Sequence, residues 1–182
     1  GSSGTYVERN WIITAGNARA WGRWLGERYR RAEHVIWFNG ADLPPEKGAD
    51  IWREFAAGLR EGDGGSHLIS LHPCGGRSSS YYHAEPWLDF NSIQTWADFT
   101  KIRPLVREDY SLQPVKPVVH VEGAYEAGTE YPTRPITPLV VRRQAYWAHL
   151  SGAGHTYGHN DVWRRLPSWR DAVEAPGARQ MG

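Results

Sequence analysis

The chain has 182 residues, enough for one domain with a substantial core. Its 21 Lys and Arg residues balance 20 Asp and Glu residues to a net charge of +1, which gives no electrostatic basis for a nucleic-acid partner or an anionic membrane. The single cysteine, Cys74, excludes an internal disulfide and a cysteine-rich zinc site, and no apolar run approaches the roughly 18 residues that a membrane span needs.

The N-terminal segment opens on the polar stretch GSSGTYVERN rather than on a basic and then apolar one. We therefore expect residues 1–13 to be a tag-derived or trimmed end without a signal peptide. Residues 14–182 are expected to form the domain. An extracellular or periplasmic location of the full-length protein is compatible with this reading, and the location itself stays open.

The first expected helix spans residues 17–30, where Trp21, Leu25 and Tyr29 recur four apart on one face. Thr14 or Asn17 can cap its start. A β-branched and aromatic run over residues 33–42 predicts the first strand.

The next helix, over residues 48–65, has an apolar stripe and ends at glycines; the stripe consists of Ile51, Phe55 and Leu59. Two further strands are expected at residues 67–73 and 87–95. A polar, helix-prone stretch at residues 97–112 leads to a fourth strand at residues 116–124. Residues 138–150 predict a helix that closes on Gly152 and Gly154, and residues 155–163 a fifth strand or its exit loop.

Strands that alternate with helices indicate parallel pairing in an α/β fold. No Gly-rich dinucleotide or phosphate loop follows the first strand, so a nucleotide-binding fold lacks its usual sign. The remaining common architecture is the (β/α) barrel of the TIM type, which usually takes about 250 residues and eight strands. About five strands therefore predict a partial barrel.

In parallel barrels the chemistry lies where strands end. Each expected strand ends on polar side chains, namely Asn39, Asp42, His72, Asp89, Asn91, Glu122, His155 and Tyr157. Two carboxylates on separate strand ends, near aromatic rings, suit glycosidic bond cleavage, in which one acid protonates the leaving oxygen and the other attacks the sugar or activates water. A role as a turn residue is the alternative for Asp42, which precedes Leu-Pro-Pro. Ten Trp and nine Tyr add rings that can stack on sugars or fill a core.

Seven stretches in order give a resemblance to a known family: GRWLGERYR, HVIWFNGAD, HLISLHPCGGRSS, EPWLDFNSIQT, KPVVHVEGAYE, RRQAYWAHLSGAGHTYGHNDVW and PGARQM. Over residues 14–181 the chain resembles the apiosidase-like catalytic domain family, glycoside hydrolase family 140. The resemblance implies a TIM-barrel glycosidase with an Asp after the fourth strand and a Glu after the seventh. These match Asp42 and Glu122, so the chain would supply the fourth to eighth strands. The family's usual GGD is GAD here, with Ala41 in place of a glycine.

By analogy with retaining barrel glycosidases, the resemblance implies that Asp42 is the acid/base and Glu122 the nucleophile. It implies an oligosaccharide substrate, namely apiose-containing pectic side chains. We expect no cofactor and no metal. The further residues expected in the site are His72, His155 and Tyr157 as walls, and Tyr81, His83 and Trp87 as a stacking platform or as hydroxyl contacts.

Two other readings stay open. A truncated half-barrel without catalysis could bind carbohydrate, or pair with another copy through its open sheet edge. A metal-dependent hydrolase is suggested by four histidines: His72, His120, His155 and His159. The HTYGH spacing would need a helix to bring both histidines together, and Gly154 and Gly158 disfavour one. His120 alternates with valines and is expected to point into the barrel or its wall.

Overall fold

The computed structural model describes residues 12–131 and 136–181. Apart from residues 12 and 13, the expected N-terminal segment 1–13 therefore lies outside the described residues. The chain forms two compact units. The first comprises Gly1–Cys74 and Ser78–Ser92, and the second comprises Gly75–Arg77 and Ile93–Gly182. No helix within the described ranges is both long and apolar enough to cross a membrane.

The first unit contains helix α2 (Ala18–Tyr29), strand β1 (Trp37–Leu43), helix α3 (Ala49–Asp63), strand β2 (Ile69–Pro73) and the 3-10 turn η1 (Ser79–Tyr82). β1 and β2 pair in parallel, with Trp37 opposite Ile69. The expected stripe of α3 is confirmed, because Leu59 is fully buried and Ile51 and Phe55 pack against the same cluster. α3 then ends at Gly64, whose φ of +68° is a conformation that glycine adopts readily.

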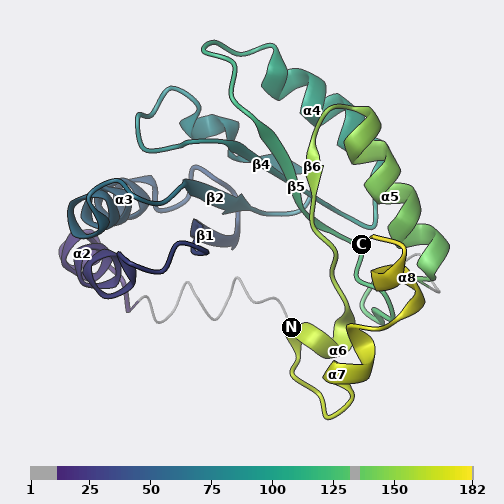
Figure 1. Cartoon of the computed structure of the whole chain (residues 1–182). Helices are drawn as coiled ribbons and strands as arrows, with labels where there is room; N and C mark the ends of the chain where they lie inside the picture. The colour runs from purple at the N-terminus through teal and green to yellow at the C-terminus, as the bar shows by residue number, and fades with distance from the viewer. Residues whose placement is uncertain (1–11, 132–135, 182) are drawn as a thin grey trace. The chain divides into compact units, whose positions relative to one another are not determined.

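Helices α2 and α3 lie against each other through glycines (Figure 1). A Cβ atom at Gly26 would lie 2.6 Å from the carbonyl oxygen of Leu59, and one at Gly58 would overlap the carbonyl of Arg19. Of the expected apolar face of α2, Leu25 packs against the core of the first unit, whereas Trp21 and Tyr29 are exposed. Small residues form the contact because they let the helix backbones approach closely.

The second unit contains most of a four-stranded sheet in the order β3-β4-β5-β6. Its strands are β3 (Arg77–Ser78), β4 (Asn91–Trp96), β5 (Val118–Gly123) and β6 (Gly154–His155), and the unit boundary passes within β3 and β4. The helical elements are η2 (Phe99–Lys101), α4 (Ile102–Tyr110), α5 (Pro138–Leu150), α6 (Asn160–Trp163), α7 (Trp169–Ala172) and α8 (Pro176–Arg179). Helices α4 and α5 pack against β5 over a core that includes Ile93, Val106, Val118 and Ala148 (Figure 1).

The α/β class and the parallel pairing of β1 with β2 and of β5 with β6 are confirmed. Helix α5 has the predicted bounds, whereas β4 begins at residue 91 rather than 87 and β6 has two residues only. The two-residue strand β3 was missed. The expected cap of α2 was also wrong, because Asn17 occupies the N-cap position but accepts a hydrogen bond from the Thr14 amide instead of a helix amide.

Candidate active site

Asp42 lies on a β-bulge at the carboxyl end of β1. Gly40 is opposite His72, but the next paired residues are Leu43 and Pro73, so two residues of β1 have no partner in the ladder. Such bulges re-aim side chains and are frequent beside active sites. The bulge leaves Asp42 exposed at the end of the strand, where a catalytic acid of a parallel α/β protein is expected.

Gly40 is the glycine on which this bulge depends. Its φ is +83°, and a Cβ atom there would lie 2.9 Å from the carbonyl oxygen of His72. Both facts require glycine at position 40. The substitution of the family's second glycine by Ala41 therefore leaves the more constrained position intact.

Asn39 and His72, two further predicted site residues, belong to the same pair of strands. Asn39 is buried, and its amide donates a 3.5 Å hydrogen bond to the carbonyl of Trp52. Its Oδ1 atom is buried without a hydrogen-bond partner among the described residues. A buried oxygen without a partner is energetically costly, and Asn39 Oδ1 also has almost no contact with solvent. His72 lies at the carboxyl end of β2 and is partly buried.

Glu122 lies one residue before the end of β5 and is partly buried. The chain directly after it is held by Gln144 of α5. The Gln144 side chain accepts a hydrogen bond from the Ala124 amide (3.0 Å) and donates one to the Ala124 carbonyl (2.8 Å). It fills the space where a Cβ of Gly123 would be, at 2.5 Å. Glycine after Glu122 therefore lets α5 fix the end of the strand that carries the acid.

A buried histidine pair lies on β5 and β6. His120 and His155 are opposite each other, their rings are stacked, and their Nδ1 atoms are 2.9 Å apart. One Nδ1 must donate and the other accept, so the two rings cannot both be doubly protonated while this contact persists. His120 Nε2 also contacts the Thr95 hydroxyl at 2.9 Å.

The histidine pair is neutral at physiological pH. Burial lowers the pKa of His120 to about 3, and the neighbouring His155 contributes to the fall. Burial also lowers the pKa of His155 to about 4, with a contribution from His149 on α5. His155 Nε2 is buried without a hydrogen-bond partner among the described residues. His155, a predicted wall residue, is therefore the end of a buried series of hydrogen bonds that connects Thr95, His120 and His155.

Trp96 is an exposed aromatic residue of the second unit that the sequence reading did not single out. It directly ends β4, is 43% exposed, and has a φ of +57°, which is strained for a residue with a large side chain. Its ring packs edge-on against Tyr131 with 5.6 Å between centroids. Burial raises the pKa of Tyr131, and the charges of Glu130 and Glu122 add to this shift. The signal in the sequence was a Trp at the end of a predicted strand.

Tyr157, a predicted wall residue, donates a 2.5 Å hydrogen bond to Glu126. Glu126 is buried, and its other carboxylate oxygen accepts from the Gly177 amide. Burial raises the pKa of Tyr157 and Glu126 raises it further, so the phenol stays protonated. A cavity of about 280 Å³ lies beside Tyr157, and its lining includes Val121, Tyr125 and Thr156. This cavity follows the ends of β5 and β6 and has aromatic walls.

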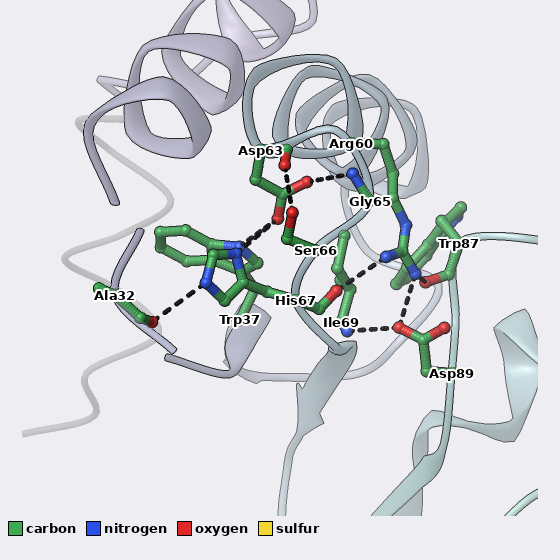
Figure 2. Close-up of polar contacts among 10 residues, drawn as sticks. All are labelled: Ala32, Trp37, Arg60, Asp63, Gly65, Ser66, His67, Ile69, Trp87 and Asp89. Carbon is green, nitrogen blue, oxygen red and sulfur yellow. Dashed lines mark hydrogen bonds and ion pairs between the residues drawn. The ribbon is translucent and has the colours of Figure 1, made fainter. Parts of the chain in front are cut away.

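Asp89 and Asn91 do not end a strand, so this expectation was wrong: β4 begins at Asn91. Asp89 instead accepts hydrogen bonds from the Ile69 amide and from Arg60, each at 2.6 Å (Figure 2). Ile69 is the first residue of β2, so Asp89 lies at the end of the strand opposite to His72. Its contacts stabilise the beginning of β2.

The expected aromatic platform after β2 is only partly available. Trp87 is 7% exposed and belongs to the core of the first unit, so it cannot offer a face to a sugar. His83 is buried and its Nδ1 atom lies 3.0 Å from the Asn91 amide nitrogen. Tyr81 alone is exposed, with its ring edge-on to Tyr82.

The first unit contains a buried polar cluster around Asp63 that the sequence reading did not predict. Asp63 accepts hydrogen bonds from Trp37 Nε1 (3.1 Å) and from the Gly65 amide (2.7 Å), and its Oδ2 lies 2.9 Å from His67 Nδ1 (Figure 2). Burial alone would raise the pKa of Asp63, but these hydrogen bonds together hold it below its usual value. Trp37 and His67 precede or begin the strands, so the cluster stabilises the end of β1 and β2 away from Asp42.

The three second-unit histidines considered for a metal, His120, His155 and His159, have other contacts. His120 and His155 bind each other, and His159 Nδ1 accepts from the Asp161 amide as the cap of α6. Within the described ranges, no three acidic, His or Cys side chains gather as a metal site would require. His120 is also fully buried beside His155 and Thr95.

The two predicted catalytic carboxylates belong to different parts of the structure. Asp42 is in the first unit, on the β1–β2 sheet, and Glu122 is in the second unit, on the four-stranded sheet. Both stand at or next to the carboxyl end of a parallel strand. Their meeting at one glycosidic bond stays a prediction.

Comparisons of sequence and of structure both found similarity to glycoside hydrolases or to an apiosidase-like catalytic domain. Residues 2–182 match the sequence family described as "Apiosidase-like, catalytic domain". A solved structure named "Glycoside hydrolase" is 29% identical with a TM-score of 0.83, and the match covers 93% of this chain and 45% of that one. A glycoside hydrolase family 5 structure from Bacteroides vulgatus ATCC 8482 is 31% identical with a TM-score of 0.82, and covers 93% and 43%. The chain thus spans less than half of these two structures. A search of curated proteins gave no match.

Proposed function

We propose that this chain, which belongs to the apiosidase-like catalytic domain family, works as part of a retaining glycoside hydrolase. The family membership confirms the resemblance seen in the seven sequence motifs. In this proposal its strands are the fourth to eighth of a TIM-type (β/α) barrel. The observation that carries it is the position of Asp42 and Glu122, each at the carboxyl end of a parallel strand.

In the proposed reaction Glu122 attacks the anomeric carbon while Asp42 donates its proton to the departing glycosidic oxygen. The carbon–oxygen bond breaks, and a covalent glycosyl ester forms on Glu122. Asp42, now a carboxylate, then takes a proton from a water molecule, which attacks the same carbon and releases Glu122. This double displacement requires the two carboxyl groups to stand about 5 Å apart.

The surroundings of each acid support these roles. The bulge at Gly40 leaves Asp42 accessible to a leaving group, as an acid/base must be. The two hydrogen bonds from the Gln144 side chain to the Ala124 backbone hold the chain after Glu122, which favours a fixed position for a nucleophile. Trp96 offers an exposed, rigid aromatic face in the same unit as Glu122, suited to stacking on a sugar ring.

The proposed substrate is a pectic oligosaccharide that carries apiose, in line with the family. The test uses the full-length protein and two apiosides that differ in the acidity of the leaving group. We expect Asp42→Asn to lose far more activity on the substrate with a poor, alkyl leaving group than on a nitrophenyl apioside, which needs no proton. Proton NMR should show that the first product retains its anomeric configuration. Equal losses on both substrates, or an inverted product, would overturn the assignment.

A second candidate is a non-catalytic unit that binds carbohydrate or pairs with another copy. The observation that favours it is the coverage of less than half of each related structure. Sedimentation and a substrate screen separate the two, since a monomer that hydrolyses glycosides rules the second candidate out.

A further inference from the structure

A groove outside the sheet, between helices α4 and α5, has the features of a second ligand site. It has a volume of about 870 Å³, within the range of roughly 300–1,000 Å³ that is typical of ligand sites. Arg103 and Arg107 of α4 and Arg142 and Arg143 of α5 line it. We call the groove lined by these four arginines and by Tyr110, Tyr146, Trp147 and Leu150 the basic groove.

The four arginines carry charge that the described residues do not neutralise. None of their guanidinium groups forms an ion pair with another residue in the described part of the chain. Glu108 alone brings an acid to the adjoining hollow. Arg103 and Arg107 stand four apart on α4, a spacing at which like charges destabilise a helix. In a chain of net charge +1, this is a local concentration of positive charge that fits an anion.

Aromatic and apolar side chains form the rest of the basic groove. Tyr146 is 60% exposed and Leu150 is 85% exposed, and both lie on α5 beside Trp147. Exposed rings next to guanidinium groups suit a ligand that has apolar faces as well as negative charge. A simple inorganic anion would not use the rings.

Several groups in the basic groove are already fixed. The Arg143 guanidinium lies 4.2 Å from the centre of the Phe99 ring, and Phe99 packs against Trp147 at 6.0 Å. Tyr110 donates a 2.7 Å hydrogen bond to the Gly152 carbonyl. Fixed walls reduce the entropy lost on binding, as expected of a ligand site rather than a mobile surface.

We propose that the basic groove binds an acidic oligosaccharide whose sugar rings carry carboxylates. Planar guanidinium groups pair with carboxylates through two parallel hydrogen bonds, and aromatic rings stack on the apolar faces of sugars. The choice of an oligosaccharide over an acidic peptide rests on the proposed glycosidase function. The groove would hold a charged part of the glycan apart from the catalytic carboxylates.

The test is calorimetric titration of the full-length protein carrying Glu122→Gln with tetragalacturonic acid and with its neutral methyl ester. The acid should bind at least about 10-fold more tightly than the ester and more weakly as salt rises, because each Arg–carboxylate contact contributes a charge-assisted hydrogen bond. Arg107→Gln with Arg142→Gln should weaken acid binding about 10-fold. Arg28→Gln with Arg31→Gln, a matched loss of charge in the other unit, should leave it unchanged.

Equal binding of acid and ester, equal effects of the two arginine pairs, or no binding would each overturn the proposal. A polyglutamate peptide of equal charge should bind about 10-fold more weakly, and Tyr146→Ala should remove that difference. Polyglutamate that binds as tightly as the sugar would identify a protein-docking surface instead. A protein that binds the acid in the basic groove but hydrolyses no glycoside would refute the proposed function alone.

Discussion

Replacement of Gly123 by Ala tests whether the contact with Gln144 fixes the strand end beside Glu122. The new methyl group would lie 2.5 Å from Gln144 Oε1, so the Gln144 side chain must leave its place. Two buried hydrogen bonds to Ala124 are then lost, each worth about 1 kcal/mol, and residual crowding adds about 1–2 kcal/mol. We expect the free energy of unfolding to fall by about 3–4 kcal/mol, and any glycosidase activity to fall with it.

Urea denaturation of four proteins forms the assay: wild type, Gly123→Ala, Gln144→Ala and the double variant. Gln144→Ala should itself cost about 2–3 kcal/mol, because the Ala124 backbone groups stay buried and unpaired. Once Gln144 is truncated, Gly123→Ala should add less than about 0.5 kcal/mol. Gly154→Ala is the control, since its methyl would meet Val119 at an ordinary 3.6 Å. Additive effects of the two changes would refute the reasoning.

Three further predictions concern pH and glycine packing. Stability should fall as the pH drops from about 6.5 to about 4. In the folded protein His120 and His155 have pKa values of about 3 and about 4, so over this range only the unfolded chain takes up protons at these residues. Urea denaturation at each pH should show a loss of up to about 1.4 kcal/mol in the free energy of unfolding per pH unit for each histidine. Gly40→Ala should cost about 1–3 kcal/mol in the same assay and lower activity with Asp42 displaced, whereas unchanged stability would contradict the strained conformation. Gly58→Ala should also destabilise by about 1–3 kcal/mol despite the better helix propensity of Ala, and a more stable variant would show that α2 and α3 can separate freely.

Local sequence signals were sufficient to predict the bounds of elements whose ends are set by residues within or next to them. Helix α5 has the predicted bounds because Pro138 is favoured in the first turn and Gly152 follows the last one. The valine-rich run that includes Val118, Val119 and Val121 likewise located β5, and Glu122 next to its end. The family resemblance came from such local stretches, and the match over residues 2–182 confirms it.

Contacts between residues that are far apart in the sequence could not be predicted from local sequence patterns. Gly22 and Gly26 of α2 contact α3 but carry no hydrophobic signal, so the apolar pattern of Trp21, Leu25 and Tyr29 did not reveal this contact face. Asp89 was placed in the site because its partner Arg60, 29 residues away, is not visible from the local pattern. The bulge that exposes Asp42 depends on the register of β1 against β2, and no stretch of β1 alone specifies it.

The most direct measurement is the rate of apioside hydrolysis by the full-length protein with Glu122→Gln, set against wild type. The amide keeps the shape of the carboxylate but cannot attack the sugar, so we predict a loss of at least about 10³-fold in kcat/KM with an unchanged melting temperature. A variant that hydrolyses the substrate at the wild-type rate would contradict the assignment of Glu122 as the nucleophile.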